Sequence, residues 1–191
     1  MHTIHHTEAI VLKSTIHGEA NKRLWLFTRD FGLVVAAMQG VRKPGAKLAS
    51  HSSDYSIIRV DLVKGREVWR LISAKVVKNP LEERMRESMA RAYVRTLSAL
   101  ARFLVDEGVH EELYEHVLVS AEMLQEGGYD AKLFDALSLW RVFAHLGYIA
   151  VAEADELLFT LPLREAYASV TTAQHAKMME SVKTAIEQSH L

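Results

Sequence analysis

Short runs rich in apolar and β-branched residues, some of them alternating with polar ones, recur within the first 80 positions of the chain, which is the pattern of half-buried β-strands. The fourth run shows it most clearly, because Ile58, Val60 and Leu62 share one face. Turn residues separate the runs, including a Lys-Gly hairpin signal before the fifth. The predicted strands cover residues 8–16, 22–28, 33–40, 54–63 and 66–77. Five strands joined by short turns predict a small antiparallel barrel.

Beyond Asn79 the spacing of apolar residues changes to that of helices. Asn79 can cap a helix and Pro80 suits its first position, so we expect a first helix from there to about residue 105. Further long helices are expected over 110–126 and from Asp130 to Gly147. Short helical pieces broken at Pro162 are expected over 153–168. A last helix is expected from Thr171 or Thr172 to near the C-terminus. The sequence thus predicts an α+β fold with a barrel domain, residues 1–79, and an all-α domain, residues 80–191.

Charge divides the chain at the same place. Residues 1–80 carry thirteen Lys and Arg against six acids, a net charge of +7, and residues 81–191 carry ten against eighteen, a net charge of −8. A basic half suggests a module attracted to polyanions. The chain has no cysteine, no signal-peptide core and no apolar stretch long enough to span a bilayer. We therefore expect a cytoplasmic protein without disulfides or membrane contact.

Motifs for catalysis and metal binding do not fit. Gly40 and Gly45 have the spacing of a phosphate-binding loop, but Ala46 stands where that loop needs lysine. His110 and His116 are six residues apart, whereas a helical zinc pair needs four. No serine or cysteine nucleophile motif is present. We expect no catalytic residue, metal, cofactor or small-molecule substrate.

The basic residues of the predicted barrel favour nucleic-acid binding instead. The loop GVRKPGAKLAS, residues 40–50, is kept irregular by glycine and proline and carries three cations. Aromatic residues at 25, 27, 31, 55 and 69 offer platforms for bases, although Trp25 and Phe27 are more readily placed in the core. The candidate DNA-binding residues are Lys22, Arg23, Arg42, Lys43, Lys47, Tyr55, Arg59, Arg66 and Arg70.

Three segments in order then give a family resemblance. GEANKR covers 18–23, TRDFG covers 28–32, and GVRKP covers 40–44 before Lys47-Leu48. Together with the strands between them, they resemble the opening of the bacterial RecO recombination mediator family over about 43 residues. Downstream, NPLEE at 79–83 and LGY at 146–148 are also similar.

This resemblance implies an oligonucleotide-binding (OB) barrel followed by a helical domain. It also implies binding of single- and double-stranded DNA, annealing of complementary strands, and action with RecR and the tail of the single-stranded DNA-binding protein SSB to load the RecA recombinase. Many family members carry a four-cysteine zinc element after the LGY segment. Residues 149–161 contain no cysteine here, so contacts made by that element cannot be transferred.

The first predicted helix carries four arginines on one narrow stripe. Arginine beside apolar surface suits an acidic peptide that ends in a hydrophobic residue, such as the SSB tail. The alternative is a solvated face whose arginines pair with local acids, for example Glu87 with Arg91. The stripe consists of Arg84, Arg91, Arg95 and Arg102.

Two other functions remain open from the sequence. A protein-interaction scaffold would dock partners on both domains and bind DNA weakly at physiological salt. An RNA- or ribosome-binding OB protein would prefer RNA to DNA of equal length. A titration of both polymers over a salt series separates these alternatives from a DNA-repair mediator.

Overall fold

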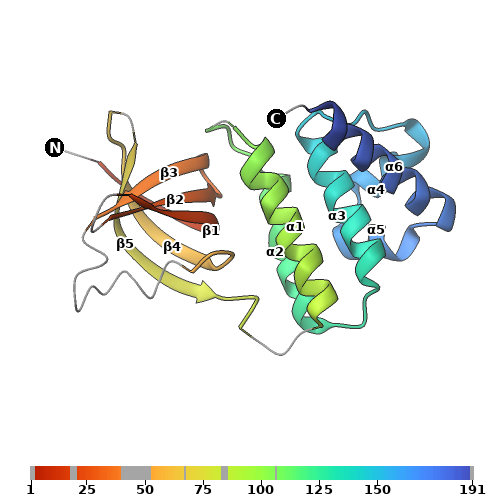
Figure 1. Cartoon of the computed structure of the whole chain (residues 1–191), viewed down its shortest axis with the longest axis horizontal. Helices are drawn as coiled ribbons and strands as arrows, with labels where there is room; N and C mark the ends of the chain where they lie inside the picture. The colour runs from red at the N-terminus through yellow and green to blue at the C-terminus, as the bar shows by residue number, and fades with distance from the viewer. Residues whose placement is uncertain are drawn as a thin grey trace. The chain divides into compact units, whose positions relative to one another are not determined.

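The computed structural model describes residues 3–17, 21–39, 53–66, 68–82, 86–105 and 107–189. It confirms the predicted α+β fold, in which five strands precede the helices (Figure 1). Contacts within the chain define two compact units. The barrel unit comprises residues 1–83 and 104–114, and the helical unit comprises residues 84–103 and 115–191.

Five strands form a closed barrel in the order β1-β2-β3-β5-β4. Neighbouring strands are antiparallel except β3 and β5, which pair in parallel where Ala36 meets Trp69 and Ala37 meets Arg70. This is the OB-type barrel that the sequence predicted. The strands are β1 (Ile4–His17), β2 (Asn21–Thr28), β3 (Gly32–Met38), β4 (Ile57–Val63) and β5 (Trp69–Lys78).

Alternate residues of each strand point into the barrel and form its core. Ile58, Val60 and Leu62 are all buried there, as predicted. Phe27 is also buried, but on the outer side of β2, where the ring of Tyr114 covers it at a centroid distance of 5.3 Å. Part of the barrel's outer surface is therefore closed by protein rather than free for a ligand.

The cover comes from residues 104–114, which join the first two long helices and include the start of the second, and which belong to the barrel unit. Glu107 accepts hydrogen bonds from Lys64 at 2.8 Å and from the indole N–H of Trp69 at 3.2 Å. Gly32 has φ +61, and a Cβ built on it would lie 2.1 Å from the carbonyl oxygen of Gly108. Both the left-handed backbone and the close approach require glycine at position 32.

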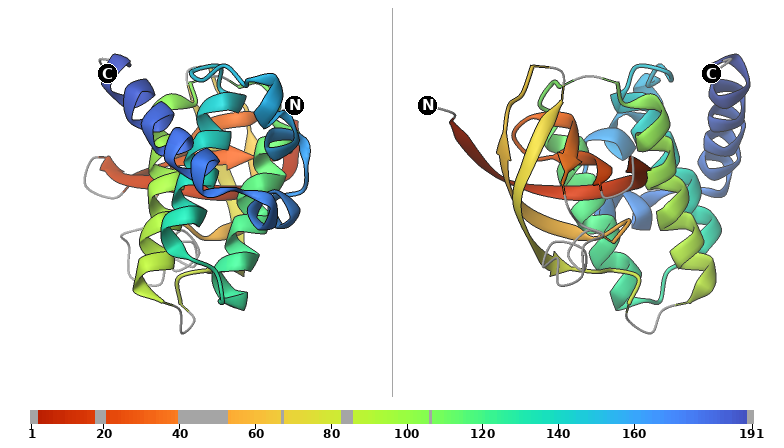
Figure 2. Two further views of the ribbon diagram at one scale, coloured as in Figure 1. Left: turned by 90° about the vertical axis from the view of Figure 1, so that its right-hand side faces the viewer. Right: turned by 60° about the vertical axis from the view of Figure 1, so that its left-hand side comes forward.

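The helical unit is built around α3, which packs against α1 and α6 (Figures 1 and 2). Asp130 caps α3 through bonds to two backbone N–H groups, as predicted. Thr171 caps α6 in a reciprocal arrangement with Gln174. The helices are α1 (Glu87–Phe103), α2 (Glu111–Glu126), α3 (Ala131–His145), a 3₁₀ turn η2 (Glu153–Asp155), α4 (Glu156–Thr160), α5 (Leu163–Ser169) and α6 (Thr172–Gln188).

The predicted start of the first helix at Pro80 is wrong. Strand β5 continues to Lys78, and residues 80–82 form a turn. Asn79 accepts from the backbone N–H of Leu81 and donates to the carboxylate of Glu82, so its side chain supports the turn rather than a helix. The described part of α1 begins at Glu87.

A histidine lies buried between α2 and α3. His116 is 5% exposed, and neither of its ring nitrogens has a hydrogen-bond partner among the described residues. Burial, together with the nearby charges of Arg141 and His145, lowers the pKa of His116 from 6.5 to about 3. This imidazole is therefore neutral at physiological pH.

Residues 149–161, the cysteine-free segment, hold η2 and α4. The buried guanidinium of Arg141 donates to the carbonyl oxygens of Phe159 and Leu161 at the end of α4. Asp155 accepts from Lys177 at 2.6 Å, which ties η2 to α6. An arginine and an ion pair thus anchor this segment to neighbouring helices. Across the described residues, no helix combines the length and apolarity needed to cross a membrane.

Candidate nucleic-acid interface

Trp25 lies partly exposed on the outer surface of the barrel. It pairs across the sheet with Lys13 of β1 and Val35 of β3. The ammonium of Lys13 lies 4.5 Å from the centroid of the indole ring. The surface therefore offers an aromatic face beside a cation, the combination that stacks a base and neutralises its phosphate.

A row of three residues crosses the same surface next to Trp25. Arg23 lies opposite Ala37, and Ala37 pairs in turn with Arg70. Because the side chain of Ala37 is small, it does not fill the space between the two arginine side chains. The Nε of Arg23 is buried and has no hydrogen-bond partner among the described residues, while its terminal nitrogen lies 3.4 Å from His17. We call Lys13, Arg23, Trp25, Ala37 and Arg70 the β1–β3 face.

The other predicted DNA-binding residues are dispersed. Arg59 on β4 is exposed, with its Nε 4.0 Å from Glu8, and Arg66 is exposed in the turn after β4. Lys22 pairs with Met38, on the opposite side of β2 from Arg23. Tyr55 is partly buried before β4, with φ +70, and its backbone N–H donates to the carbonyl of Val11. The loop cations Arg42, Lys43 and Lys47 lie outside the described residues.

Most of the aromatic residues considered as platforms are covered. Phe27 is fully buried and Trp69 is 4% exposed. Phe31 packs against Trp69 and His5 at ring distances of 5.3 and 5.2 Å. Trp25, which the sequence alone placed more readily in the core, is partly exposed and has a cation beside it. Trp69 also has a cation beside it, Lys64, but its ring is buried. Lys13 was not recognised as the partner of Trp25, because only the β1–β2 register brings the two together.

On α1, the stripe arginines have local partners. Arg91 binds Glu87 at 3.0 Å in an exposed pair, and the guanidinium of Arg102 lies over the ring of Phe103. Arg95 binds Asp135 of α3 at 2.6 Å, and burial raises the pKa of that carboxyl group. Arg84 lies outside the described residues.

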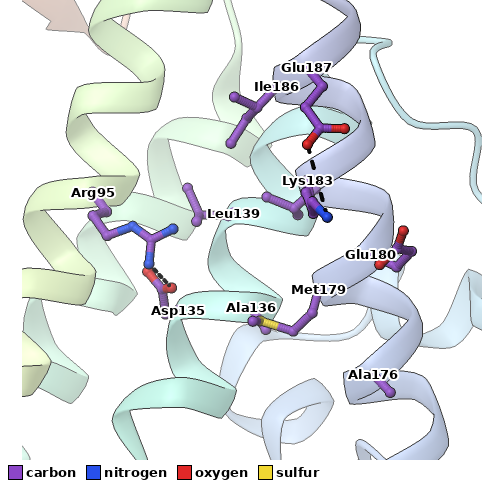
Figure 3. Close-up of a pocket in the computed structure, with 11 residues that line it drawn as sticks. Arg95, Asp135, Ala136, Leu139, Ala176, Met179, Glu180, Lys183, Ile186 and Glu187 are labelled. Carbon is purple, nitrogen blue, oxygen red and sulfur yellow. Dashed lines mark hydrogen bonds and ion pairs between the residues drawn. The ribbon is translucent and has the colours of Figure 1, made fainter.

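Arg95 also stands between two hollows of the helical unit. One, of about 460 Å³, lies between α1, α3 and α6 and is lined by apolar residues that include Leu139, Met179 and Ile186 (Figure 3). Charged residues also line it, namely Arg95, Asp135, Glu180, Lys183 and Glu187. The other, of about 240 Å³, is lined by cations that include Arg91 and Lys132. The sequence could not reveal this neighbourhood, because it joins three helices distant along the chain.

A serine, an aspartate and a histidine meet on the barrel. His6 and Ser73 both bond to the carboxylate of Asp61. In a nucleophilic triad the histidine lies between the serine and the carboxylate, whereas here the carboxylate lies between the serine and the histidine. Those bonds lower the pKa of Asp61. Among the described residues, no three His, Asp or Glu side chains gather as metal ligands would.

Comparison with known proteins shows a similarity to one family. The model of the recombination protein O N-terminal domain matches residues 1–80, which hold all five strands. The DNA repair protein RecO of Pelotomaculum thermopropionicum is 29% identical over 96% of this chain and 75% of its own length. Residues 1–80 thus match the RecO N-terminal domain, and most of the chain is similar to RecO proteins.

Other relatives match shorter stretches. The DNA repair protein RecO of Exiguobacterium sibiricum is 26% identical over 73% of this chain and 56% of its own length. The protein of the same name from Bacillus subtilis is 27% identical over 63% of this chain and 47% of its own. The chain thus spans about half the length of several curated RecO relatives. What those whole proteins do is carried to this chain only as a proposal.

Proposed function

We propose that this chain is a DNA repair and recombination mediator that binds DNA through its barrel without strong sequence preference. The observation that carries the proposal is the β1–β3 face, where Trp25 and Lys13 adjoin the row formed by Arg23 and Arg70. A base stacks on the indole while the cations contact phosphates. Because every base has such a face, this mode tolerates any sequence. The RecO relatives are named as DNA repair proteins, which supports the same role.

Mediator function extends this binding to annealing and to partners. Neutralised phosphates let two complementary strands approach, which promotes annealing. RecR and the RecA recombinase are proposed partners by family resemblance. No bond-breaking chemistry is proposed, since the role consists of binding and positioning strands.

The first prediction concerns the β1–β3 face. Replacing Arg23 and Arg70 by alanine should flatten the dependence of log K on log salt for single-stranded DNA by about 1.4, from roughly 0.7 for each lost phosphate contact. Trp25→Ala should weaken binding by about 1–3 kcal/mol while leaving that slope unchanged, because stacking releases no counterions. Fluorescence anisotropy of labelled dT20 over a salt series measures both quantities.

Arg86→Ala, which removes an exposed cation from the helical unit, serves as the control. An unchanged slope in the folded double variant would contradict the proposed site. The same series on Arg42→Ala/Lys43→Ala/Lys47→Ala tests the predicted loop, for which a decrease of about 2 is expected. RNA of equal length tests the RNA-binding alternative, and weak binding of both polymers at physiological salt would favour the scaffold.

We also propose that the hollows beside Arg95 receive the SSB tail. The smaller one offers Arg91 and Lys132 to acidic side chains. The larger one offers the apolar side chains of Leu139, Met179 and Ile186 to a hydrophobic end, while the carboxylates that also line it keep acidic side chains to the smaller hollow. The second prediction follows. Met179→Glu should lower affinity for a fluorescent SSB tail peptide about tenfold or more, because it puts a repelling charge on an exposed wall residue.

Leu157→Glu is the matched control, since Leu157 is an exposed apolar residue of the same unit outside these hollows. Equal peptide affinity in the Met179 and Leu157 variants would exclude this docking site. DNA affinity should be unchanged in both, because the barrel is untouched.

A further inference from the structure

Strand β5 carries a second set of cations on the outer side of the barrel. Arg70 and Lys75 are exposed and Lys78 is partly exposed, and β5 contains no acidic residue. Lys75 lies directly opposite Arg59. We call Arg59, Arg70, Lys75 and Lys78 the β5 ridge.

The ridge is poorly neutralised within the protein. Like charges directly opposite on neighbouring strands destabilise a sheet, yet Arg59 and Lys75 occupy such a pair. The carboxylate of Glu8 lies 4.0 Å from Arg59. The same carboxylate also forms an ion pair with Arg29 and accepts a hydrogen bond from the hydroxyl of Tyr114. Among the described residues, the other three ridge cations have no ion-pair partner. A surface that tolerates this repulsion is suited to an external polyanion.

The β5 ridge differs from the β1–β3 face in having two β-bulges and no exposed aromatic ring. The register of β4 with β5 shifts at Ile72 and at Val77, and these extra residues are exposed to solvent. Bulges and lysines on a strand discourage pairing with another strand, so an added peptide strand fits poorly. The described outward residues of β5 include no aromatic ring, so unstacked bases have no platform there. The ridge is therefore suited to contacts with the phosphates of a nucleic acid.

We propose that the β5 ridge is a second nucleic-acid site, which holds a second DNA strand by its phosphates while the β1–β3 face holds the first. The inference rests on the proposed DNA-binding function and explains how one barrel brings two strands together. Arg70 lies at the junction of the two surfaces. From Arg70 to Lys78 the strand extends roughly 25 Å, which is long enough to follow several phosphates of one DNA strand.

Energy transfer between two labelled strands tests the proposal on the full chain. Donor-labelled dT10 and acceptor-labelled dT10 cannot pair with each other, so transfer requires both on one protein assembly. The wild type should show transfer at one protein to one of each strand. Lys75→Ala/Lys78→Ala should weaken binding of the second strand roughly tenfold and abolish the transfer, because two phosphate contacts are lost. Affinity for the first strand should change less than twofold.

Arg86→Glu is the matched control, because it makes the net charge more negative by the same two units, but in the helical unit, and should leave transfer unchanged. Annealing of two complementary 30-mers should slow in the ridge variant and not in the control. Persistent transfer in the folded ridge variant would overturn the proposal, and so would loss of the first strand along with the second, which would indicate one continuous site. Failure of the wild type to bind dT10 at all would instead overturn the proposed function itself.

Discussion

Gly32→Ala is expected to lower the free energy of unfolding of the barrel unit by about 3–4 kcal/mol. An alanine held at a positive φ costs about 1–2 kcal/mol, and its methyl group would overlap the carbonyl oxygen of Gly108. That oxygen belongs to backbone, which cannot rotate away as a flexible side chain can. Either residues 104–114 lift from the barrel or the turn before β3 is distorted. Urea titration followed by tryptophan fluorescence measures the loss, since Trp25 and Trp69 both lie in the barrel unit.

Gly127→Ala supplies the matched comparison. Its φ is +71, but nothing lies within 4 Å of the added Cβ. Only the backbone strain of about 1–2 kcal/mol is therefore expected. Equal losses in the two variants would show that the close approach of Gly108 to Gly32 contributes nothing.

Acidification should destabilise the helical unit through His116. The folded protein holds the pKa of this imidazole at about 3, and the unfolded chain has it near 6.5. Between these values His116 is protonated in the unfolded state and neutral in the folded state. The free energy of unfolding therefore falls as pH decreases through this window. The slope is about 1.4 kcal/mol per pH unit, or about 3 kcal/mol between pH 6.5 and pH 4. Well above pH 6.5 this contribution is complete and constant.

His116→Leu isolates this effect, because it removes the titrating group while the surrounding carboxylates stay the same. The variant should differ little from the wild type at pH 7 and be more stable by about 2 kcal/mol at pH 5. Urea titrations at intervals of half a pH unit give the difference. Parallel stability curves would show that His116 does not resist protonation in the folded state.

The barrel was predictable because its signals are local. Alternation in β4 and tight turns between strands appear in windows of ten residues, and the inward set Ile58, Val60 and Leu62 follows directly. The caps Asp130 and Thr171 were predictable for the same reason. The start of α1 was not, because Asn79 and Pro80 favour a turn as readily as a helix.

The candidate site depends on register, which a single sequence does not display. Arg23 and Arg70 become neighbours of one alanine only because β3 and β5 pair in parallel. The bulges at Ile72 and Val77 interrupt the alternation of β5, so the side on which Lys75 emerges cannot be counted from the strand's start. Composition indicated a basic barrel, whereas the arrangement of its cations needed the fold.

The placement of residues 104–114 on the barrel has a consequence for the order in which the protein is completed during synthesis. When the last strand has left the ribosome, the outer side of Phe27 still lacks Tyr114, and Trp69 still lacks Glu107. Seventeen residues of α1 must be made before that cover arrives. The barrel's final contacts therefore join residues far apart in the chain, which slows their formation and leaves an apolar surface exposed in the nascent protein.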